Sequence, residues 1–310
     1  MIESENFKIR SDYGEVELFC KAYLPEGGVK EAKGIVEIVH GMCEHIARYD
    51  GFMRYLAENG YIAAAHDLRG HGESVKSDEE LGYFGDKTGE AVVNDVFKVT
   101  KALKERYQNL PVVLLGHSMG AMIVRVFLQE HDKEIEGLIV SGSPSKNALA
   151  GAGIALDKTI GLFRGERHRS KMMAALATGN GDKNFPGEGK NAWLTRDKSV
   201  VDAYNADKKC GFVFTCNGFE NLLRLMKNTY DKKRYRVQNP NLPIFFISGS
   251  NDPIMISEDK WVAAQNDLRD AGYQNVSGRL YHEMRHEVLN ELKKEEVYAD
   301  VKAFIDGCTD

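Results

Sequence analysis

One pentapeptide, Gly116-His117-Ser118-Met119-Gly120, constrains the fold of this 310-residue chain more than any other stretch. The residues before it, 112–115, are β-branched or leucine, which is typical of a buried strand. After it, apolar side chains recur at the three- and four-residue spacing of an amphipathic helix. The serine is therefore predicted to lie on a sharp strand-to-helix turn, where only glycine two positions before and after leaves room for the crossing elements.

Strand and helix patterns alternate along most of the chain. Strand patterns cover 34–39, 61–66, 112–115, 138–140, 242–247 and 279–281, after an opening hairpin of 7–10 and 16–23. Helical patterns cover 52–59, 88–108 with Thr88 as N-cap, 257–271 with Ser257 as N-cap, and 290–305. This alternation predicts a mainly parallel sheet with helices on both faces. Functional groups should gather at the carboxyl ends of its strands.

The alternation breaks down in residues 145–238. This stretch holds Ala/Gly-rich and Lys/Arg-rich segments, the turn-like Gly179-Asn180-Gly181-Asp182 and a helical run at 222–226. We therefore expect residues 1–144 and 239–310 to form one α/β core. Residues 145–238 should be an inserted helical cap, or lid, over the strand ends.

Composition excludes several classes of protein. A net charge of −5 and a pI near 6.0 argue against nucleic-acid binding, which needs a basic face. No signal peptide is visible and no apolar stretch is long enough to span a bilayer, so a cytoplasmic location is expected. The five cysteines are scattered and lack C-x-x-C spacing, which indicates free thiols and no zinc site.

A serine nucleophile needs a general base, and the base needs a group that holds its tautomer. With a G-x-S-x-G turn, the expected chain order is serine, acid, histidine. Asp252 follows the strand 242–247 and is the candidate acid, although it could instead cap the helix that begins near Ser257. His286 follows the strand 279–281 and is the candidate base, with His282 as its rival.

The oxyanion formed in acyl transfer needs two backbone N–H donors. One should come from Met119, the residue after the nucleophile, at the positive end of a helix. The other should come from Met42, in the loop after the strand that runs into His40-Gly41. The alternative is that His40-Gly41 is only a tight turn.

Four motifs then make a family resemblance specific. They are His40-Gly41-Met42-Cys43-Glu44-His45-Ile46-Ala47-Arg48-Tyr49, Asp67-Leu68-Arg69-Gly70-His71-Gly72-Glu73-Ser74, Gly249-Ser250-Asn251-Asp252-Pro253 and Met284-Arg285-His286-Glu287. In this order they resemble the monoacylglycerol lipase and lysophospholipase branch (serine aminopeptidase S33-like, Hydrolase_4) of the α/β-hydrolases. The resemblance implies an eight-stranded sheet with a helical cap.

The same resemblance assigns the nucleophile to Ser118, the acid to Asp252 and the base to His286. It also implies that Glu44 and Arg48 help to shape the end of the site that receives glycerol hydroxyls. At a spacing of four residues, Glu44 and Arg48 could equally form a structural ion pair.

The expected function is that of a serine esterase or lipase. Its substrates should be monoacylglycerols, lysophospholipids or small acyl esters, because a cap rich in Phe and Leu offers an apolar acyl slot. No metal or organic cofactor is expected, and the cap should contact a membrane surface transiently. Two alternatives stay open: a peptidase of the proline-iminopeptidase type, and a ligand-binding protein without catalysis on the same fold.

Overall fold

The computed structural model describes residues 2–178 and 181–309, and its strands form one sheet in the order β1-β2-β4-β3-β5-β6-β7-β8. The strands are β1 (Glu3–Arg10), β2 (Glu17–Leu24), β3 (Ile35–Val39), β4 (Ile62–His66), β5 (Val112–His117), β6 (Gly137–Ser141), β7 (Ile244–Gly249) and β8 (Val276–Tyr281). Strand β2 is antiparallel to both of its neighbours, and every pair from β4 to β8 is parallel. The prediction of an eight-stranded, mainly parallel sheet is confirmed.

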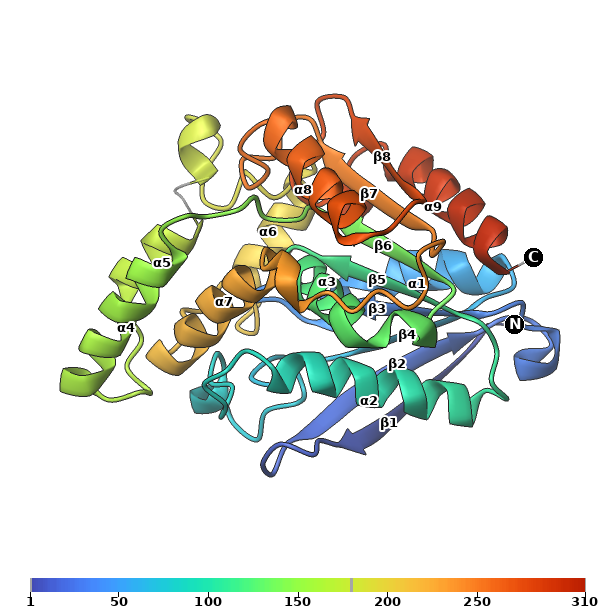
Figure 1. Cartoon of the computed structure of the whole chain (residues 1–310), viewed down its shortest axis with the longest axis horizontal. Coiled ribbons are helices and arrows are strands. Elements are labelled where there is room, and N and C mark those ends of the chain that lie inside the picture. Colours follow the sequence, from blue (N-terminus) through green and yellow to red (C-terminus); the bar gives the residue numbers. More distant parts are fainter. Residues whose placement is uncertain (1, 179–180, 310) are drawn as a thin grey trace.

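Helices cover both faces of this sheet (Figure 1). Helices α1 (Asp50–Glu58) and α9 (Lys294–Thr309) pack on one face, and α2 (Ala91–Arg106), α3 (Met119–His131) and α8 (Glu258–Ala271) pack on the other. Strand β3 shows why a helix layer is needed on each face of the sheet, since its alternate residues enter different hydrophobic cores. Ile35 belongs to the core under α2 and α3, whereas Val36 belongs to the core under α1 and α9.

The chain between β6 and β7 holds α4 (Ala150–Arg164), α5 (Lys171–Thr178), α6 (Lys198–Ala206) and α7 (Cys216–Thr229). Helix α7 packs on α3, and α4 packs on α7. In Figure 1, α4 and α5 lie at the left edge, away from both termini. The Ala/Gly-rich stretch forms α4, and Gly153 permits a close approach to α7, because a Cβ at this position would lie 3.1 Å from the Leu223 side chain. The turn predicted at 179–182 lies partly outside the described residues.

Three predicted helix starts were wrong by a few residues. Helix α1 begins at Asp50 and not at 52. Helix α2 begins at Ala91, because the Thr88 hydroxyl donates to Asp86 at 2.6 Å and accepts from the Glu90 N–H, which forms a local turn. Helix α9 begins at Lys294 and not at 290. The N-cap at Ser257 is confirmed, since its hydroxyl accepts from the Lys260 N–H. Within the described ranges, none of the helices has the length and hydrophobicity that a bilayer span requires.

Candidate active site

Ser118 is the single residue between the end of β5 and the start of α3. Its backbone has φ 54° and ψ −113°, a conformation that side-chain-bearing residues rarely adopt and that stores strain. The flanking glycines are a steric necessity. A Cβ on Gly116 would lie 2.4 Å from the Gly120 carbonyl oxygen, and a Cβ on Gly120 would lie 2.1 Å from the Val39 carbonyl oxygen. The turn thus presents the Ser118 side chain beyond the carboxyl end of β5.

Asp252 and His286 follow β7 and β8, and they are hydrogen-bonded to each other. His286 Nδ1 lies 2.9 Å from Asp252 Oδ2, and both side chains are buried. Burial disfavours both charges, yet the pKa of Asp252 lies below its ordinary value and that of His286 above, because each group stabilises the charge of the other. His282, the rival base, is exposed, and Ser257 caps α8.

Ser118 and His286 line the same cavity, which has a volume of about 710 Å³. Asp252 lies behind His286 and does not line it. The second ring nitrogen of His286, Nε2, is buried and has no hydrogen-bond partner among the described residues. The ring is therefore held through Nδ1 and leaves Nε2 available to a group in the cavity.

Met42 and Met119 line this cavity too. In the loop after β3, the Gly41 N–H donates to Glu44 Oε1 at 2.6 Å and the Cys43 N–H donates to His71 Nε2 at 3.3 Å. The Met42 N–H between them has no acceptor in the part of the chain that is described. Met119 is the first residue of α3, where a helix leaves its N–H groups without internal acceptors.

Glu44 and Arg48 form the ion pair that the sequence left as an alternative. Arg48 donates to Glu44 Oε2 at 2.5 Å and makes two bonds to Glu287, at 2.7 and 2.6 Å. Burial opposes the charge on Glu44, but the Arg48 guanidinium holds the pKa of this carboxyl below its ordinary value. Glu44 and Glu287 line the cavity, whereas Arg48 does not. Glu44 also fixes Gly41, so it positions the loop that carries Met42.

Sequence reasoning missed the structural role of residues 67–74, which contact and support the loop that carries Met42. Asp67 accepts from the Ile46 N–H at 2.9 Å. Burial lowers the pKa of His71 to about 4, so its ring stays neutral, donates from Nδ1 to the Arg69 carbonyl and can accept at Nε2.

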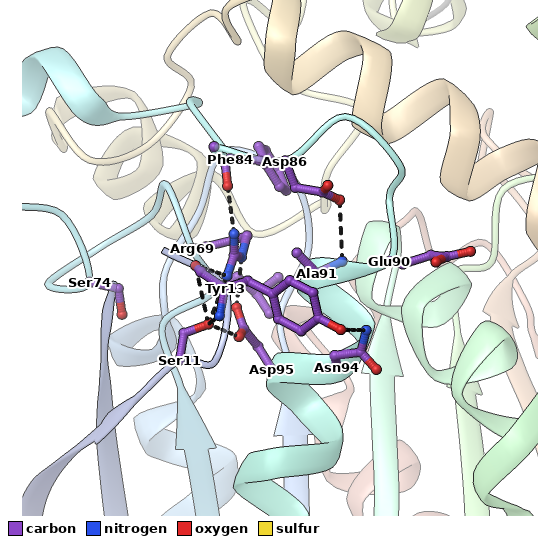
Figure 2. Close-up of polar contacts among 12 residues, drawn as sticks. Ser11, Tyr13, Arg69, Ser74, Phe84, Asp86, Glu90, Ala91, Asn94 and Asp95 are labelled. Atoms are coloured by element: carbon purple, nitrogen blue, oxygen red, sulfur yellow. Dashed lines mark hydrogen bonds and ion pairs between the residues drawn. The ribbon is translucent and has the colours of Figure 1, made fainter. Parts of the chain in front are cut away.

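Arg69 anchors the same segment from within the core. The residue is only 1% exposed, and its side chain pairs with Asp95 of α2 at 2.7 Å. Figure 2 shows this guanidinium surrounded by Asp95, the Ser11 hydroxyl and the backbone carbonyls of Tyr13 and Phe84. A signal was present in the sequence, because Asp95 interrupts the apolar stripe of its helix.

A second missed feature is the contact between the segment that joins β6 to β7 and the loop that carries His286. The Glu287 N–H donates to the Leu194 carbonyl at 2.7 Å, and the Trp193 ring lies 5.0 Å from that of His286. Arg285 donates to the Ala192 carbonyl at 2.6 Å and pairs with Glu188. Residues 188–194 therefore hold the His286 loop in place, a contact across about 90 residues of chain that no local pattern reveals.

Comparison with known proteins shows the family of this chain. A family model described as serine aminopeptidase, S33 (Hydrolase_4), matches residues 30–293. The chain is 26% identical over 278 residues to a monoglyceride lipase of Rattus norvegicus, covering 89% of this chain and 81% of that protein. It is 25% identical over 293 residues to a monoacylglycerol lipase of Mycolicibacterium smegmatis, covering 94% of each.

A solved structure shares both the fold and the arrangement of elements. The crystal structure of a highly thermostable carboxyl esterase from Bacillus coagulans, in complex with glycerol, matches with a TM-score of 0.89 at 25% identity, covering 99% of both chains. The family model spans residues 30–293, which is more than half of the chain. The chain belongs to the serine aminopeptidase S33 (Hydrolase_4) family of α/β-hydrolases.

Proposed function

We propose a reaction mechanism for this chain, which is a serine ester hydrolase of the monoglyceride lipase type. Ser118 Oγ attacks the ester carbonyl carbon while His286 Nε2 takes its proton, and Asp252 stabilises the imidazolium. The N–H groups of Met42 and Met119 hold the oxyanion. His286 then gives its proton to the departing alcohol, which leaves an acyl group on Ser118. A water molecule, deprotonated by His286, releases the acid by the reverse sequence.

One observation supports this reaction above all. The buried Asp252–His286 pair leaves Nε2 without a partner beside the cavity that Ser118 lines. An unpaired buried polar atom is costly, and this one lies at a cavity where a substrate group could pair with it. A base with a vacant nitrogen that lines the same cavity as a strained serine is the arrangement that nucleophilic catalysis needs.

We propose that the acyl group of a monoacylglycerol, a lysophospholipid or a smaller ester occupies the apolar part of the cavity. That part is lined by Leu156, Met173, Phe219, Leu223 and Met226 from the insertion and by Met122 from α3. A volume of about 710 Å³ lies within the range typical of small-molecule sites, about 300–1,000 Å³. The polar end, with Glu44 and Glu287, would receive the alcohol, and Arg48 would act there only through these two carboxylates.

The two alternatives are not favoured. The relatives reported above are glyceride lipases and an esterase. A protein that only binds ligands would have no need of the strain at Ser118 or of the Asp252–His286 pair.

Residues 145–238 are proposed to be the cap, and its helices α4 and α5 to contact a membrane surface. Leu162 and Phe163 at the end of α4 are 82% and 79% exposed. Leu149, Leu156, Met172 and Leu176 of the same two helices and their flank are exposed as well. Exposed apolar side chains gathered on two neighbouring helices favour a contact with a lipid or a protein, and the proposed lipid substrate favours the lipid. The five free cysteines support the cytoplasm as the proposed compartment.

The membrane contact can be tested apart from catalysis. In Leu162→Ser/Phe163→Ser, the fraction of protein that sediments with phosphatidylcholine vesicles should fall, while hydrolysis of soluble p-nitrophenyl butyrate stays unchanged. Leu292→Ser, which alters an exposed leucine of the core, is the matched control. Equal sedimentation of all three proteins would contradict the contact.

The reaction itself is tested with Ser118→Ala. Wild type should cleave p-nitrophenyl butyrate and monoacylglycerols but not proline p-nitroanilide, and the variant should cleave none of them while melting at the wild-type temperature or above. Hydrolysis that survives the substitution would refute the mechanism. Cleavage of the anilide alone would refute the ester specificity. A series of monoacylglycerols of graded chain length would then define the acyl slot.

A further inference from the structure

Three side chains with metal-binding atoms meet where the loop after β3 contacts the insertion. They are His45 of that loop, and Asp207 and Cys210 of the segment after α6. His45 Nε2 lies 2.8 Å from Asp207 Oδ2, and these two atoms and Cys210 Sγ all lie within 4.8 Å of one another. Within residues 2–178 and 181–309, this is the one group of three such side chains close enough to share an ion. His45 and Asp207 are 162 positions apart, so no motif of local spacing predicts this group of side chains.

The donor atoms match a borderline-soft cation. One imidazole nitrogen, one carboxylate oxygen and one thiol sulfur are ligands that Zn²⁺ takes, usually in a tetrahedron. Bonds of about 2.0–2.3 Å place neighbouring ligands about 3.3–3.8 Å apart, so closing around an ion requires a movement of about 1 Å. His45 and Asp207 are partly exposed and Cys210 is buried, which leaves an approach from solvent and a fourth position for water.

The surrounding charge favours a cation. Carboxylates outnumber cationic side chains around the three ligands: Asp207, Glu44, Glu287, Asp67 and Glu73 against Arg48 and Lys209. Lys209 is already paired with Glu73, and Arg48 with Glu44 and Glu287. Burial raises the pKa of the Cys210 thiol, so the free thiol stays protonated. A coordinated divalent ion displaces that proton, because metal-bound thiols are deprotonated.

We propose that His45, Asp207 and Cys210 bind Zn²⁺ or a chemically similar divalent cation and thereby fasten the insertion to the core. The attachment point lies beside the proposed oxyanion hole. The Gly211 N–H and the Tyr204 hydroxyl both donate to the Cys43 carbonyl, at 2.9 and 3.0 Å, and Cys43 follows Met42. An ion that draws His45 toward Cys210 moves this loop, so zinc should slow hydrolysis without entering the reaction.

Binding is measured first, independently of activity, on the full chain stripped with a chelator and then dialysed. Calorimetric titration with ZnCl₂ should give one ion per chain, and Co²⁺ should give the near-ultraviolet charge-transfer band of a metal-bound thiolate. Cys210→Ser and His45→Gln should each weaken zinc binding by more than about 100-fold, because even outer-shell partners of a metal are worth about 10- to 100-fold. Cys216→Ser, a buried cysteine elsewhere in the insertion, is the matched control and should bind as wild type does.

Two outcomes would overturn the proposal. One is the absence of the thiolate band with Co²⁺. The other is a zinc affinity that falls in His286→Ala but not in Cys210→Ser, which would place the ion in the catalytic cavity. Thermal unfolding of the metal-free variants shows whether they are folded. If Cys210→Ser does not fold, His45→Gln still tests the site. Wild type that binds zinc but loses no activity would contradict the effect on the loop, whereas inhibition that disappears in both ligand variants supports it.

Discussion

Replacing Asp252 by asparagine tests the proposed mechanism most sharply, because the change is nearly isosteric and its consequence follows from the hydrogen bonds. Asp252 Oδ1 accepts from the Ile254 N–H at 2.8 Å, and Oδ2 accepts from His286 Nδ1 at 2.9 Å. An asparagine must keep its oxygen toward the Ile254 N–H, since a backbone N–H can only donate. Its amide nitrogen then faces His286 Nδ1, which must become the acceptor.

The imidazole proton therefore moves to Nε2, the atom proposed to take the Ser118 proton. In serine hydrolases this wrong tautomer lowers kcat by about 10⁴-fold, which corresponds to about 5.4 kcal/mol of transition-state stabilisation. The assay is the kcat for p-nitrophenyl butyrate, with thermal unfolding to show that the variant is folded. Asp259→Asn makes the same change at an exposed position of α8 and should leave kcat unchanged.

The reasoning would be refuted by a folded Asp252→Asn protein whose kcat lies within about tenfold of wild type, a loss of only about 1.4 kcal/mol. Such a result would mean that the tautomer of His286 is held by another group, or that His286 is not the base.

Three further predictions follow from the same contacts. Arg69→Met leaves Asp95 buried without its cation and should lower the free energy of unfolding, measured by urea titration, by about 3–5 kcal/mol. Lys8→Met breaks an exposed ion pair and should lower it by less than about 1 kcal/mol. The base must be neutral, and the pKa of His286 is raised above 6.5, so kcat/KM should fall with decreasing pH at a midpoint above pH 6.5. A midpoint below pH 6.5 would contradict the role of the buried pair. Gly120→Ala places a methyl group 2.1 Å from a β3 carbonyl oxygen and should abolish activity even where circular dichroism shows that folded protein remains.

Much of the core could be predicted because its signals are local. Residues 112–127 carry a strand, a turn with obligatory glycines and a helix within one continuous stretch. Pattern and steric necessity therefore point to the same structure. Helix starts were less predictable, as at Thr88, because side-chain hydrogen bonds compete with the first helical turn. The segment between β6 and β7 was least predictable, since α4 has too few buried apolar residues to show a clear stripe.

The sequence by itself determined the order and type of the core elements, the turn at Ser118, and the positions of Asp252 and His286 after later strands. These follow from periodicity, glycine sterics and the rule that parallel strands end at one edge of a sheet. Only the tertiary structure decided which nitrogen of His286 is occupied, that Arg48 pairs with Glu287, and that Cys210 lies beside His45. Such contacts join residues tens to hundreds of positions apart. Whether they form depends on differences in distance of a few tenths of an ångström, which local patterns do not encode.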